Sequence, residues 1–469
     1  MTMKLFNTLS RKKETLKPIK KGVVGFYSCG PTVYNYAHIG NLRSYIFADI
    51  LQRTLEYEGY RVKRVMNITD VGHLTSDADS GEDKLEKAAA LSQKTPQQIA
   101  QFYTQAFLQD IKALNIKKPK IIIPATKTIK EQIAIIKKLV AKGYAYQTSL
   151  AVYFDVTKFK NYGALSGQSL KEKMVAARDE VVEDEEKKNV ADFALWFKLA
   201  GRHIKHAMHW RSPWGEGFPG WHIECSAIST KHLGQPFDIH SGGVDHIGTH
   251  HTNEIAQSEA AFGLPLAKIW MHGEFLLIDN GKMAKSDGKF ITLQTLKDKG
   301  FSPLDYRYLC LTAHYRSRLN FSYDSLEGAQ NAYQNLVRLF AESKSEKSKA
   351  KHVSAKSFVQ KFQDRLNEDL DLPGALAVLW EAAKSKSLSG QDKMALAKDF
   401  DQVLGLELVK AVKSASAIPG AVLSIARQRQ QLRQQKKFAE ADRLRLELAK
   451  KGYEMKDLPD NSFSLLKIN

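Results

Sequence analysis

Apolar and polar positions near the start of the chain predict a strand, a loop, a helix and a second strand. Residues 23–29, VVGFYSC, form a nearly continuous apolar run of the kind found in buried strands. Residues 41–60 carry apolar side chains at helical spacing, and residues 61–69, RVKRVMNIT, return as a strand. Because the loop before the helix is punctuated by glycine, this order predicts an α/β fold that holds a nucleotide at the start of the helix.

A similar pattern returns in the middle of the chain. Residues 237–261, FDIHSGGVDHIGTHHTNEIAQSEAA, run from a strand through a glycine turn into a helix, and an alternating segment before them, AVYFDV, predicts another strand. We therefore expect one parallel-sheet domain that is split by an insertion. The expected boundaries are residues 1–115 for its first half, 116–210 for the insertion, 211–275 for its second half and 276–322 for a linking region.

The last third of the chain has a helical pattern. Beyond Tyr323 we expect an α-helical bundle at residues 323–408 and a small basic region at residues 409–469, in which residues 425–452 form a helical stretch that stops at a glycine. From residue 408 to the end, thirteen Lys and Arg stand against six Asp and Glu, and the whole chain carries a formal charge of +19. Such a surplus favours a polyanionic partner, although charge alone leaves RNA, DNA and anionic surfaces open.

Composition narrows the class of protein. A chain of 469 residues is too long for one compact core, so several domains are expected. No apolar run approaches the length of about 18 residues that a membrane-spanning helix needs. The first residues, MTMKLFNTLSRKK, lack the apolar core of a secretory signal, so we expect a cytoplasmic protein without membrane contact. The three cysteines, Cys29, Cys225 and Cys310, do not suggest a disulfide framework.

Two cysteines, a histidine and a glutamate have the chemistry of a metal site. His250 and Glu254 are four residues apart, which places both on one face of a helix, and Cys29 and Cys225 end segments that could converge on the same sheet edge. Zinc binds such a set of donors tetrahedrally. Spacing alone favours the alternative of two core cysteines with a surface His–Glu pair. It also leaves three other histidines open as competitors for the ligand role: His240, His246 and His251.

Two short segments carry groups suited to binding phosphates. In AHIGN, His38 and Asn41 can donate hydrogen bonds, and Gly40 lets the backbone approach a phosphate closely. In GKMAKSDGKF, Lys282 and Lys285 stand three apart among small residues, as in a loop that closes over a polyphosphate. An ordinary lysine-rich turn is the alternative for the second segment.

Taken together, AHIGN and KMAKS resemble the first and second signatures of the class I aminoacyl-tRNA synthetases. The chain is similar to one family among them, the cysteinyl-tRNA synthetases, in the same order and over nearly its whole length. The segments that carry this resemblance are FYSCGPTVYNYAHIGN, MNITDVGH, DFALWFK, SPWGEGFPGWHIECSA, FDIHSGGVDHIGTHHTNEIAQSEA, HGEFLLIDNGKMAKS, LTAHYRSRLNFS and the basic FAEADRLRLEL.

The resemblance implies a zinc ion and an amino-acid pocket. In that family zinc is held at the positions that match Cys29, Cys225, His250 and Glu254, and the thiolate of the substrate cysteine becomes a further ligand. The HHxNE motif favours His250 over His251 for this role. Zinc prefers a thiolate to a hydroxyl, so it can separate cysteine from serine. Thr69 and Trp221 match residues that line the amino-acid pocket, with a strand-end threonine and a core tryptophan as the alternatives.

The resemblance also implies a fold, a reaction and partners. The expected fold is a Rossmann-type parallel-sheet domain, followed by a helical bundle and a small anticodon-binding domain. L-Cysteine reacts with ATP, assisted by Mg²⁺, and the cysteinyl group passes to cysteine tRNA; a monomer is expected. The groups expected to stabilise charge on the phosphates are His38, Asn41, Lys282 and Lys285. The groups expected beside the nucleotide are Gly40, Gly242, Gly243, Asp245 and Lys285.

Two positions depart from the class I signatures, and two rival functions stay open. The first signature usually ends in His, where this chain has Asn41, and the second usually has Ser where it has Ala284. We expect altered rates with retained activity. The rivals are a cysteine ligase that acts on an aminosugar and lacks the anticodon-binding end, and an inactive RNA-binding relative. Tyr453 and Phe463 could stack on anticodon bases, with core packing as the alternative.

Overall fold

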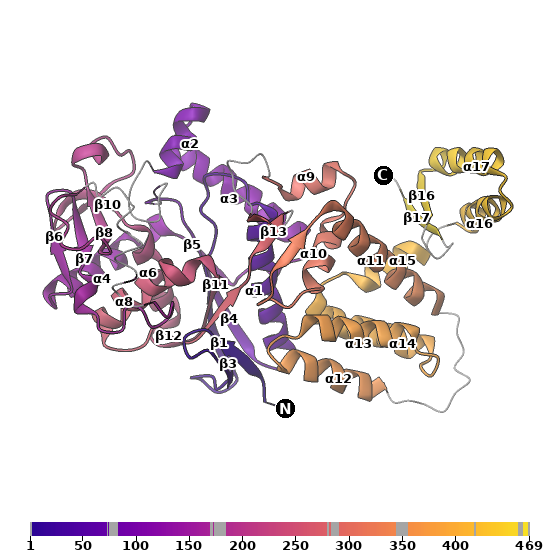
Figure 1. Cartoon of the computed structure of the whole chain (residues 1–469), viewed down its shortest axis with the longest axis horizontal. Helices are drawn as coiled ribbons and strands as arrows, with labels where there is room; N and C mark the ends of the chain where they lie inside the picture. Colours follow the sequence, from indigo (N-terminus) through magenta and orange to yellow (C-terminus); the bar gives the residue numbers. More distant parts are fainter. Residues whose placement is uncertain are drawn as a thin grey trace. The chain divides into compact units, whose positions relative to one another are not determined.

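The computed structural model describes residues 2–72, 74, 83–168, 172, 184–278, 281–282, 290–343, 355–416, 419–457 and 463–467. The chain forms two compact units (Figure 1). Unit 1 comprises Met1–Leu296, Ala313–Asn320 and Asn367–Leu370, and unit 2 comprises Lys297–Thr312, Phe321–Leu366 and Asp371–Asn469.

Unit 1 is built on a five-stranded parallel sheet with the order β12–β11–β3–β4–β5. Its strands are β3 (Val23–Ser28), β4 (Arg61–Ile68), β5 (Ile121–Pro124), β11 (Phe237–Gly243) and β12 (Ala267–Gly273). On one face Val24 and Phe26 pack against Leu51 of helix α1 (Ile39–Tyr57), and on the other Tyr27 packs against Ile228 of α6 (Trp221–Leu233). Burial of both faces explains why the strands appear in the sequence as continuous apolar runs. The predicted α/β class is confirmed.

A second, antiparallel sheet of unit 1 has the order β6–β7–β8–β10–β9. Its strands are β6 (Ala145–Gln147), β7 (Ala151–Phe154), β8 (Phe193–Lys198), β9 (Trp210–Ser212) and β10 (Gly215–Pro219), and the nearby helices are α2 (Lys84–Ser92), α3 (Pro96–Ala113) and α4 (Ile129–Ala141). Because β5 pairs within the parallel sheet and β9 and β10 pair within the antiparallel one, we propose an insertion at about residues 125–219. The division of the chain into six domains stays a prediction.

The side chain of Arg43 ties α1 to the linking region. Its guanidinium donates hydrogen bonds to four backbone carbonyls, those of Glu274, Phe275, His314 and Ser317, at 2.6–3.3 Å. These carbonyls flank a three-stranded sheet with the order β14–β13–β15, formed by β13 (Leu276–Ile278), β14 (Gly281–Lys282) and β15 (Leu319–Phe321). The start of α1 is therefore fixed beside the linking region.

Asp369 holds several segments of unit 1 together. It is fully buried, and its carboxylate accepts hydrogen bonds from the Phe6 amide at 2.8 Å, the Tyr315 hydroxyl at 2.7 Å and the Arg316 guanidinium at 2.6 and 2.8 Å. Phe6 belongs to the hairpin of β1 (Lys4–Asn7) and β2 (Lys12–Thr15). The short segment Asn367–Leu370 thus joins the hairpin to the residues that follow α10 (Pro303–Leu311).

We expect Asp369→Asn to lower the free energy of unfolding by about 1.5–3 kcal/mol, because hydrogen bonds to a charged group are lost. The neighbouring Glu368→Gln is the control. Glu368 pairs with Lys13 at the surface, where both side chains are 39–54% exposed, so its loss should cost at most about 1 kcal/mol. Urea denaturation of both variants tests this difference. Equal losses in the free energy of unfolding would show that the buried carboxylate contributes no more to stability than the exposed one.

Unit 2 is mostly helical, as expected for the region beyond residue 323. Its helices include α11 (Tyr323–Ser343), α12 (Ala355–Asn367), α13 (Leu372–Lys384), α14 (Gly390–Leu404) and α15 (Leu408–Ser416), and α9 (Leu293–Asp298) precedes α10 at the junction of the two units. The last elements are α16 (Gly420–Gln434), α17 (Phe438–Lys450), β16 (Tyr453–Asp457) and β17 (Phe463–Lys467).

The C-terminal stretch differs from its prediction in one respect. The helix predicted at residues 425–452 is broken into α16 and α17 at Lys436, whose φ is +62°. The break lets α17 fold back, so that Leu448 and Tyr453 pack with Val422 in one small core. Tyr453 is a buried core residue here, which favours the packing alternative over stacking.

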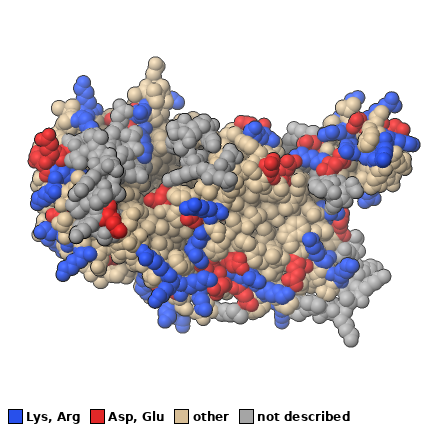
Figure 2. Space-filling model, in the orientation of Figure 1, with Lys and Arg blue, Asp and Glu red and all other residues tan. Residues whose placement is uncertain are grey.

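Lys and Arg side chains are spread over the face of the molecule shown in Figure 2, and several lie over α16 and α17. Exposed basic residues of these helices and the turns that adjoin them are Arg427, Arg433, Lys436, Lys437, Arg443, Arg445, Lys450 and Lys451.

Among the described residues, no single helix has both the length and the apolar composition to cross a membrane. One bent pair, Leu408–Ala415 with Gly420–Gln434, meets that test jointly, by length and composition alone.

Candidate functional site

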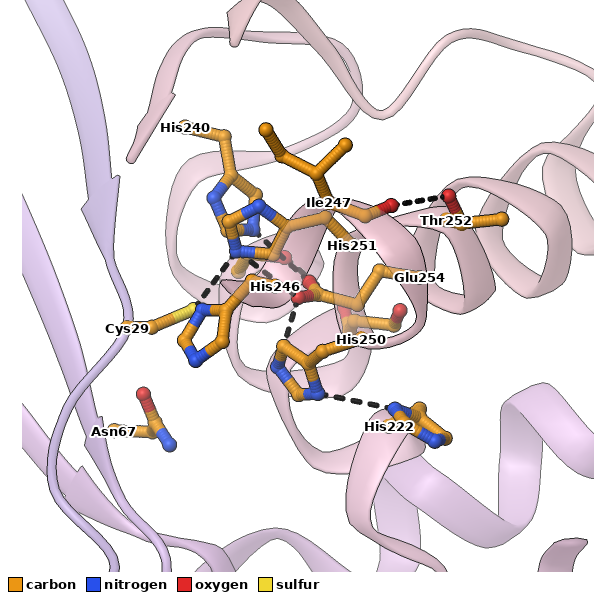
Figure 3. Close-up of polar contacts among 12 residues, drawn as sticks. Cys29, Asn67, His222, His240, His246, Ile247, His250, His251, Thr252 and Glu254 are labelled. Atoms are coloured by element: carbon orange, nitrogen blue, oxygen red, sulfur yellow. Dashed lines mark hydrogen bonds and ion pairs between the residues drawn. The ribbon is translucent and has the colours of Figure 1, made fainter. Parts of the chain in front are cut away.

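Four side chains converge at the carboxyl end of the parallel sheet. Cys29 directly follows β3, Cys225 lies in the second turn of α6, and His250 and Glu254 lie one turn apart on α8 (His250–Phe262). One donor atom of each lies within 4.8 Å of the others, and all four side chains are buried. Figure 3 shows Cys29, His250 and Glu254 directed toward one another. The structure thus brings together the set that the resemblance implied for zinc.

These four residues fit a metal ion. Glu254 Oε1 lies 3.0 Å from His250 Nε2, within ion-pair distance, yet this buried oxygen accepts no hydrogen bond. A buried carboxylate oxygen that accepts no hydrogen bond is costly, and a cation among the four donors would satisfy it. Two thiols, an imidazole and a carboxylate are donors that zinc accepts.

A second set of donors has the same compact spacing: Cys29, His240, His251 and Glu254. His240 Nε2 is hydrogen-bonded to Glu254 Oε2 at 3.0 Å, and His251 Nε2 lies 3.3 Å from Cys29 Sγ. The other nitrogen of the His251 ring is 2.8 Å from His272 Nε2. His240 contacts Glu254, and His251 contacts both Cys29 and Glu254, as residues that orient metal ligands do.

The His250 ring is held in place from two sides. Its Nδ1 lies 3.0 Å from His222 Nδ1, and the Trp221 ring stacks on it with centroids 4.3 Å apart. With Nδ1 occupied, Nε2 is the nitrogen that faces Glu254. This arrangement favours His250 as the ligand among the histidines that spacing left open.

The two cysteines and the histidine of the cluster differ in how readily they ionise. Burial raises the pKa of Cys29, but the hydrogen bond from the Cys225 thiol and the charge of His251 outweigh it and leave that pKa well below its ordinary value. Burial and the Cys29 sulfur raise the pKa of Cys225. Burial lowers the pKa of His250, but Glu254 outweighs it and raises the pKa to about 10. Because the thiolate is the form of cysteine that binds metals, Cys29 is prepared for ligation.

A cavity of about 340 Å³ opens beside the cluster. The predicted site residues that line it are Cys29, His38, Gly40, Asn41, Thr69, Trp221, Gly242, Gly243, Asp245 and His250. Cys225 and Glu254 do not line this cavity; both are fully buried. Lys285 and Ala284 lie outside the described residues, and so does the side chain of Lys282, whose backbone is part of β14.

Glycine is required at two positions of the cavity wall. A Cβ at Gly242 would lie 2.6 Å from His251 Cε1 and 2.7 Å from His246 Nδ1. A Cβ at Gly30 would lie 1.8 Å from the carbonyl oxygen of Asn67, which ends a neighbouring strand. Since no side chain fits at either place, both glycines let the walls of the cavity close tightly.

His38 begins α1 as its N-cap. Its Nδ1 accepts a hydrogen bond from the Asn41 amide at 3.1 Å, and the Asn41 side-chain oxygen accepts one from the His38 amide at 3.3 Å. With Nδ1 accepting, the ring proton sits on Nε2. Burial lowers the pKa of His38 to about 4, although Asp245 opposes this. His38 is therefore a neutral donor at neutral pH, and Asn41 retains its amide NH₂ group for a ligand.

The depressed pKa of His38 has a consequence for stability. Its folded-state pKa of about 4 lies below the ordinary value of 6.5, so the folded protein binds fewer protons than the unfolded chain between these values. We expect the wild type to lose stability relative to His38→Asn as the pH falls from 6.5 to 4. Urea denaturation of both proteins across this range measures the difference. If the free energies of unfolding of the two proteins changed in parallel with pH, the burial of a neutral His38 would be contradicted.

Two further polar residues, Asn67 and Glu224, were not predicted from sequence, and both are hydrogen-bonded to the predicted pocket residue Thr69. Thr69 donates its hydroxyl to Glu224 Oε1 and accepts a hydrogen bond from Asn67 Nδ2 at 3.0 Å. Asn67 Oδ1 in turn accepts from the Gly30 amide at 2.7 Å. Glu224 is 1% exposed, and burial raises its pKa to about 8 although the Thr69 hydroxyl opposes this. The only signal in the sequence was a glutamate directly before the predicted ligand Cys225.

Comparison with known proteins identifies the family of this chain. The family model described as the class I (C) catalytic domain of tRNA synthetases matches residues 15–331. A protein of Burkholderia lata named cysteine–tRNA ligase 1 is 47% identical over 461 residues, which cover 98% of this chain and 96% of that protein. A cysteine–tRNA ligase of Treponema denticola is 43% identical, with 97% of this chain and 98% of that protein covered.

Solved structures show the same fold. Methionyl-tRNA synthetase of Mycobacterium tuberculosis, in complex with methionyl-adenylate, superposes with a TM-score of 0.54 at 14% identity, over 83% of this chain and 90% of that one. The leucyl-tRNA synthetase of Agrobacterium radiobacter, in a ternary complex, gives a TM-score of 0.59 at 10% identity, over 85% and 86%. The family model and the two relatives show that this chain belongs to the cysteine–tRNA ligases, a family of class I aminoacyl-tRNA synthetases.

Proposed function

We propose that this chain joins L-cysteine to ATP as cysteinyl-adenylate and then transfers the cysteinyl group to the 3′ end of cysteine tRNA. One observation carries the proposal: a single cavity joins the thiol-containing donor cluster to the capped start of α1. A cysteine whose sulfur lies at the cluster can extend its carboxylate toward a nucleotide held at the helix start.

Cys29, Cys225, His250 and Glu254 would hold a zinc ion. When bound, zinc supplies a centre that prefers the sulfur of cysteine to the hydroxyl oxygen of serine. Trp221 and Thr69 line the same cavity and would contact the rest of the amino acid. No separate editing site is required by this account.

Thr69 would receive the ammonium group of the amino acid. Its hydroxyl proton is directed at Glu224 and one of its lone pairs accepts from Asn67. A hydroxyl has one donor and two acceptor positions, so one acceptor position remains for a ligand in the cavity that Thr69 lines. The hydrogen bonds behind Thr69 fix the direction of this acceptor.

The start of α1 would hold the phosphates of ATP. The positive end of a helix dipole attracts anions, and His38 Nε2 and the side-chain NH₂ group of Asn41 add two neutral donors. Gly40, Gly242 and Asp245 line the same cavity and leave space for the ribose and adenine. Lys282 and Lys285 remain predicted contacts of the leaving phosphates, with Mg²⁺ on the pyrophosphate.

The first step would be an in-line substitution at phosphorus. An oxygen of the cysteine carboxylate bonds to the α-phosphorus, the bond from this phosphorus to the bridging oxygen breaks, and pyrophosphate leaves with the bond electrons. Donors from His38 and Asn41 stabilise the charge that grows on the phosphate oxygens. In the second step a hydroxyl of the terminal tRNA ribose bonds to the carbonyl carbon, and AMP leaves with its electron pair while the hydroxyl proton is released.

The basic C-terminal helices would contact the tRNA. Their exposed Lys and Arg side chains suit a phosphate backbone, which is bound mainly through charge. We propose α16, α17 and the β16–β17 hairpin as the anticodon-binding region of a cytoplasmic monomer. Buried Arg429 pairs with the partly exposed Asp457, at 2.5 and 2.9 Å, and so holds the hairpin against α16.

Two assays test the proposed function. Pyrophosphate exchange into ATP should depend on L-cysteine and should be negligible with serine, alanine or threonine. Charging should then attach cysteine to cysteine tRNA. Exchange without charging would favour a ligase that acts on an aminosugar, and failure of both assays would favour an RNA-binding relative. Either result would overturn the proposal.

A further inference from the structure

Two exposed aromatic rings meet beside the cavity. Tyr36, in the loop before α1, is 44% exposed, and Phe102, on α3, is 47% exposed. Their ring centroids lie 6.1 Å apart with the planes at 74°, and Tyr103 lies 5.1 Å from each of them in a similar edge contact. Tyr34 adds a further ring from the same loop. We call Tyr34, Tyr36, Phe102 and Tyr103 the aromatic rim.

The rim is continuous with the wall of the cavity. Tyr34, Tyr36 and Tyr103 line the same cavity as His38 and Thr69, whereas Phe102 stands outside it. In an edge-to-face contact one ring presents its edge, so its own faces are not covered by the partner ring. Half-exposed rings at the mouth of a reaction site suit a ligand with flat, stackable groups.

Two lysine side chains lie beside the rings of the aromatic rim. Lys94 Nζ lies 5.3 Å from the centroid of the Phe102 ring, and Lys84 Nζ lies 5.9 Å from that of Tyr34. Lys84 also lines the cavity. Aromatic rings beside basic side chains form the common surface for single-stranded nucleic acid, in which bases stack on rings and phosphates meet the cations.

We propose that the aromatic rim binds the unpaired 3′ nucleotides of the tRNA by base stacking and so leads the terminal ribose into the cavity. The proposal rests on the proposed function, since a second substrate with an unpaired end must reach the cavity where the adenylate forms. The lysines beside the rim favour a polyanion over an apolar peptide, and the exposed rings favour RNA over an acidic peptide, because bases stack on rings and carboxylate side chains do not. Helix α3 packs through a different, buried ring: Phe107 is 2% exposed, and its ring centroid lies 4.9 Å from that of Tyr45.

Phe102 provides the sharpest test, because it belongs to the rim but does not line the cavity. Phe102→Ala should lower kcat/KM for tRNA in charging by about 5- to 150-fold, the range for one lost stacking partner, and this loss should exceed any loss in pyrophosphate exchange at least fivefold. Phe102→Tyr should restore charging, whereas Phe102→Leu should not. Leu91→Ala, at an 80% exposed apolar position on α2, is the matched control and should leave charging unchanged.

A direct measurement of tRNA binding tests the stacking role of the aromatic rim independently of the proposed catalytic function. Phe102→Ala should weaken binding of full-length cysteine tRNA, measured by fluorescence anisotropy, but not of the same tRNA trimmed of its unpaired 3′ nucleotides. Equal weakening of both RNAs, or rescue by leucine as complete as by tyrosine, would overturn the stacking role. Because these outcomes need no catalysis, they hold even if the enzyme proves inactive. Tyr36→Ala provides a second test of binding should Phe102→Ala lower the melting temperature.

Discussion

Replacing Cys225 by serine is expected to abolish both metal retention and cysteine activation. The Cys225 side chain is fully buried among the donors of the cluster, and a hydroxyl is a much poorer ligand for zinc than a thiolate. Without the metal the cavity loses the group that we propose distinguishes sulfur from oxygen. Metal content by mass spectrometry and cysteine-dependent pyrophosphate exchange are the two measurements, and both should fall to background.

Cys310→Ser is the matched control for this prediction. Cys310 is a cysteine of similar burial, at 6% exposed, but it lies on α10 in unit 2 and belongs to neither donor set. This variant should keep its metal and its exchange activity. Full activity in a metal-free Cys225→Ser protein would defeat the zinc proposal, and equal metal loss in both variants would point to general unfolding.

The second large effect is expected at His38. His38→Asn should lower kcat for pyrophosphate exchange by about 10²- to 10³-fold, the usual loss when one donor to a developing oxyanion is removed. Asparagine is a good N-cap, so it can replace the hydrogen bond to the Asn41 amide while losing the reach of Nε2. Stability at neutral pH should therefore stay close to that of the wild type.

His38→Ala is the companion variant, because it removes both the N-cap of α1 and the Nε2 donor. It should show the same kinetic loss and, in addition, lose about 0.5–2 kcal/mol of stability. The KM for cysteine should change little in both variants, since the donor acts on the phosphate in the transition state. A rise in the KM for cysteine with an unchanged kcat would assign His38 to substrate binding instead.

Much of the parallel-sheet domain was predictable because its strands are buried on both faces. Val24, Phe26 and Tyr27 occupy two different cores, so the strand appears in the sequence as an uninterrupted apolar run. The short strand β5 was assigned to the insertion, since four residues carry too little pattern to reveal a partner strand far away in sequence. The break at Lys436 was also missed, because lysine gives no warning of a positive φ.

The candidate site was predictable mainly through its resemblance to a family. Spacing gave the His250–Glu254 pair but left His240, His246 and His251 as competitors, since the choice depends on where α8 meets the end of β3. Asn67 and Glu224 were missed for the same reason. Their importance comes from burial and from contacts between distant segments, and neither leaves a local pattern.

The central claim is that the sulfur of the substrate binds a zinc ion held by two cysteines, a histidine and a glutamate. X-ray absorption at the zinc edge tests it most directly, with the protein measured alone, with L-cysteine and with L-serine. The account predicts two sulfur neighbours in the free protein, three with cysteine and two with serine. A sulfur count that does not rise with cysteine would contradict it.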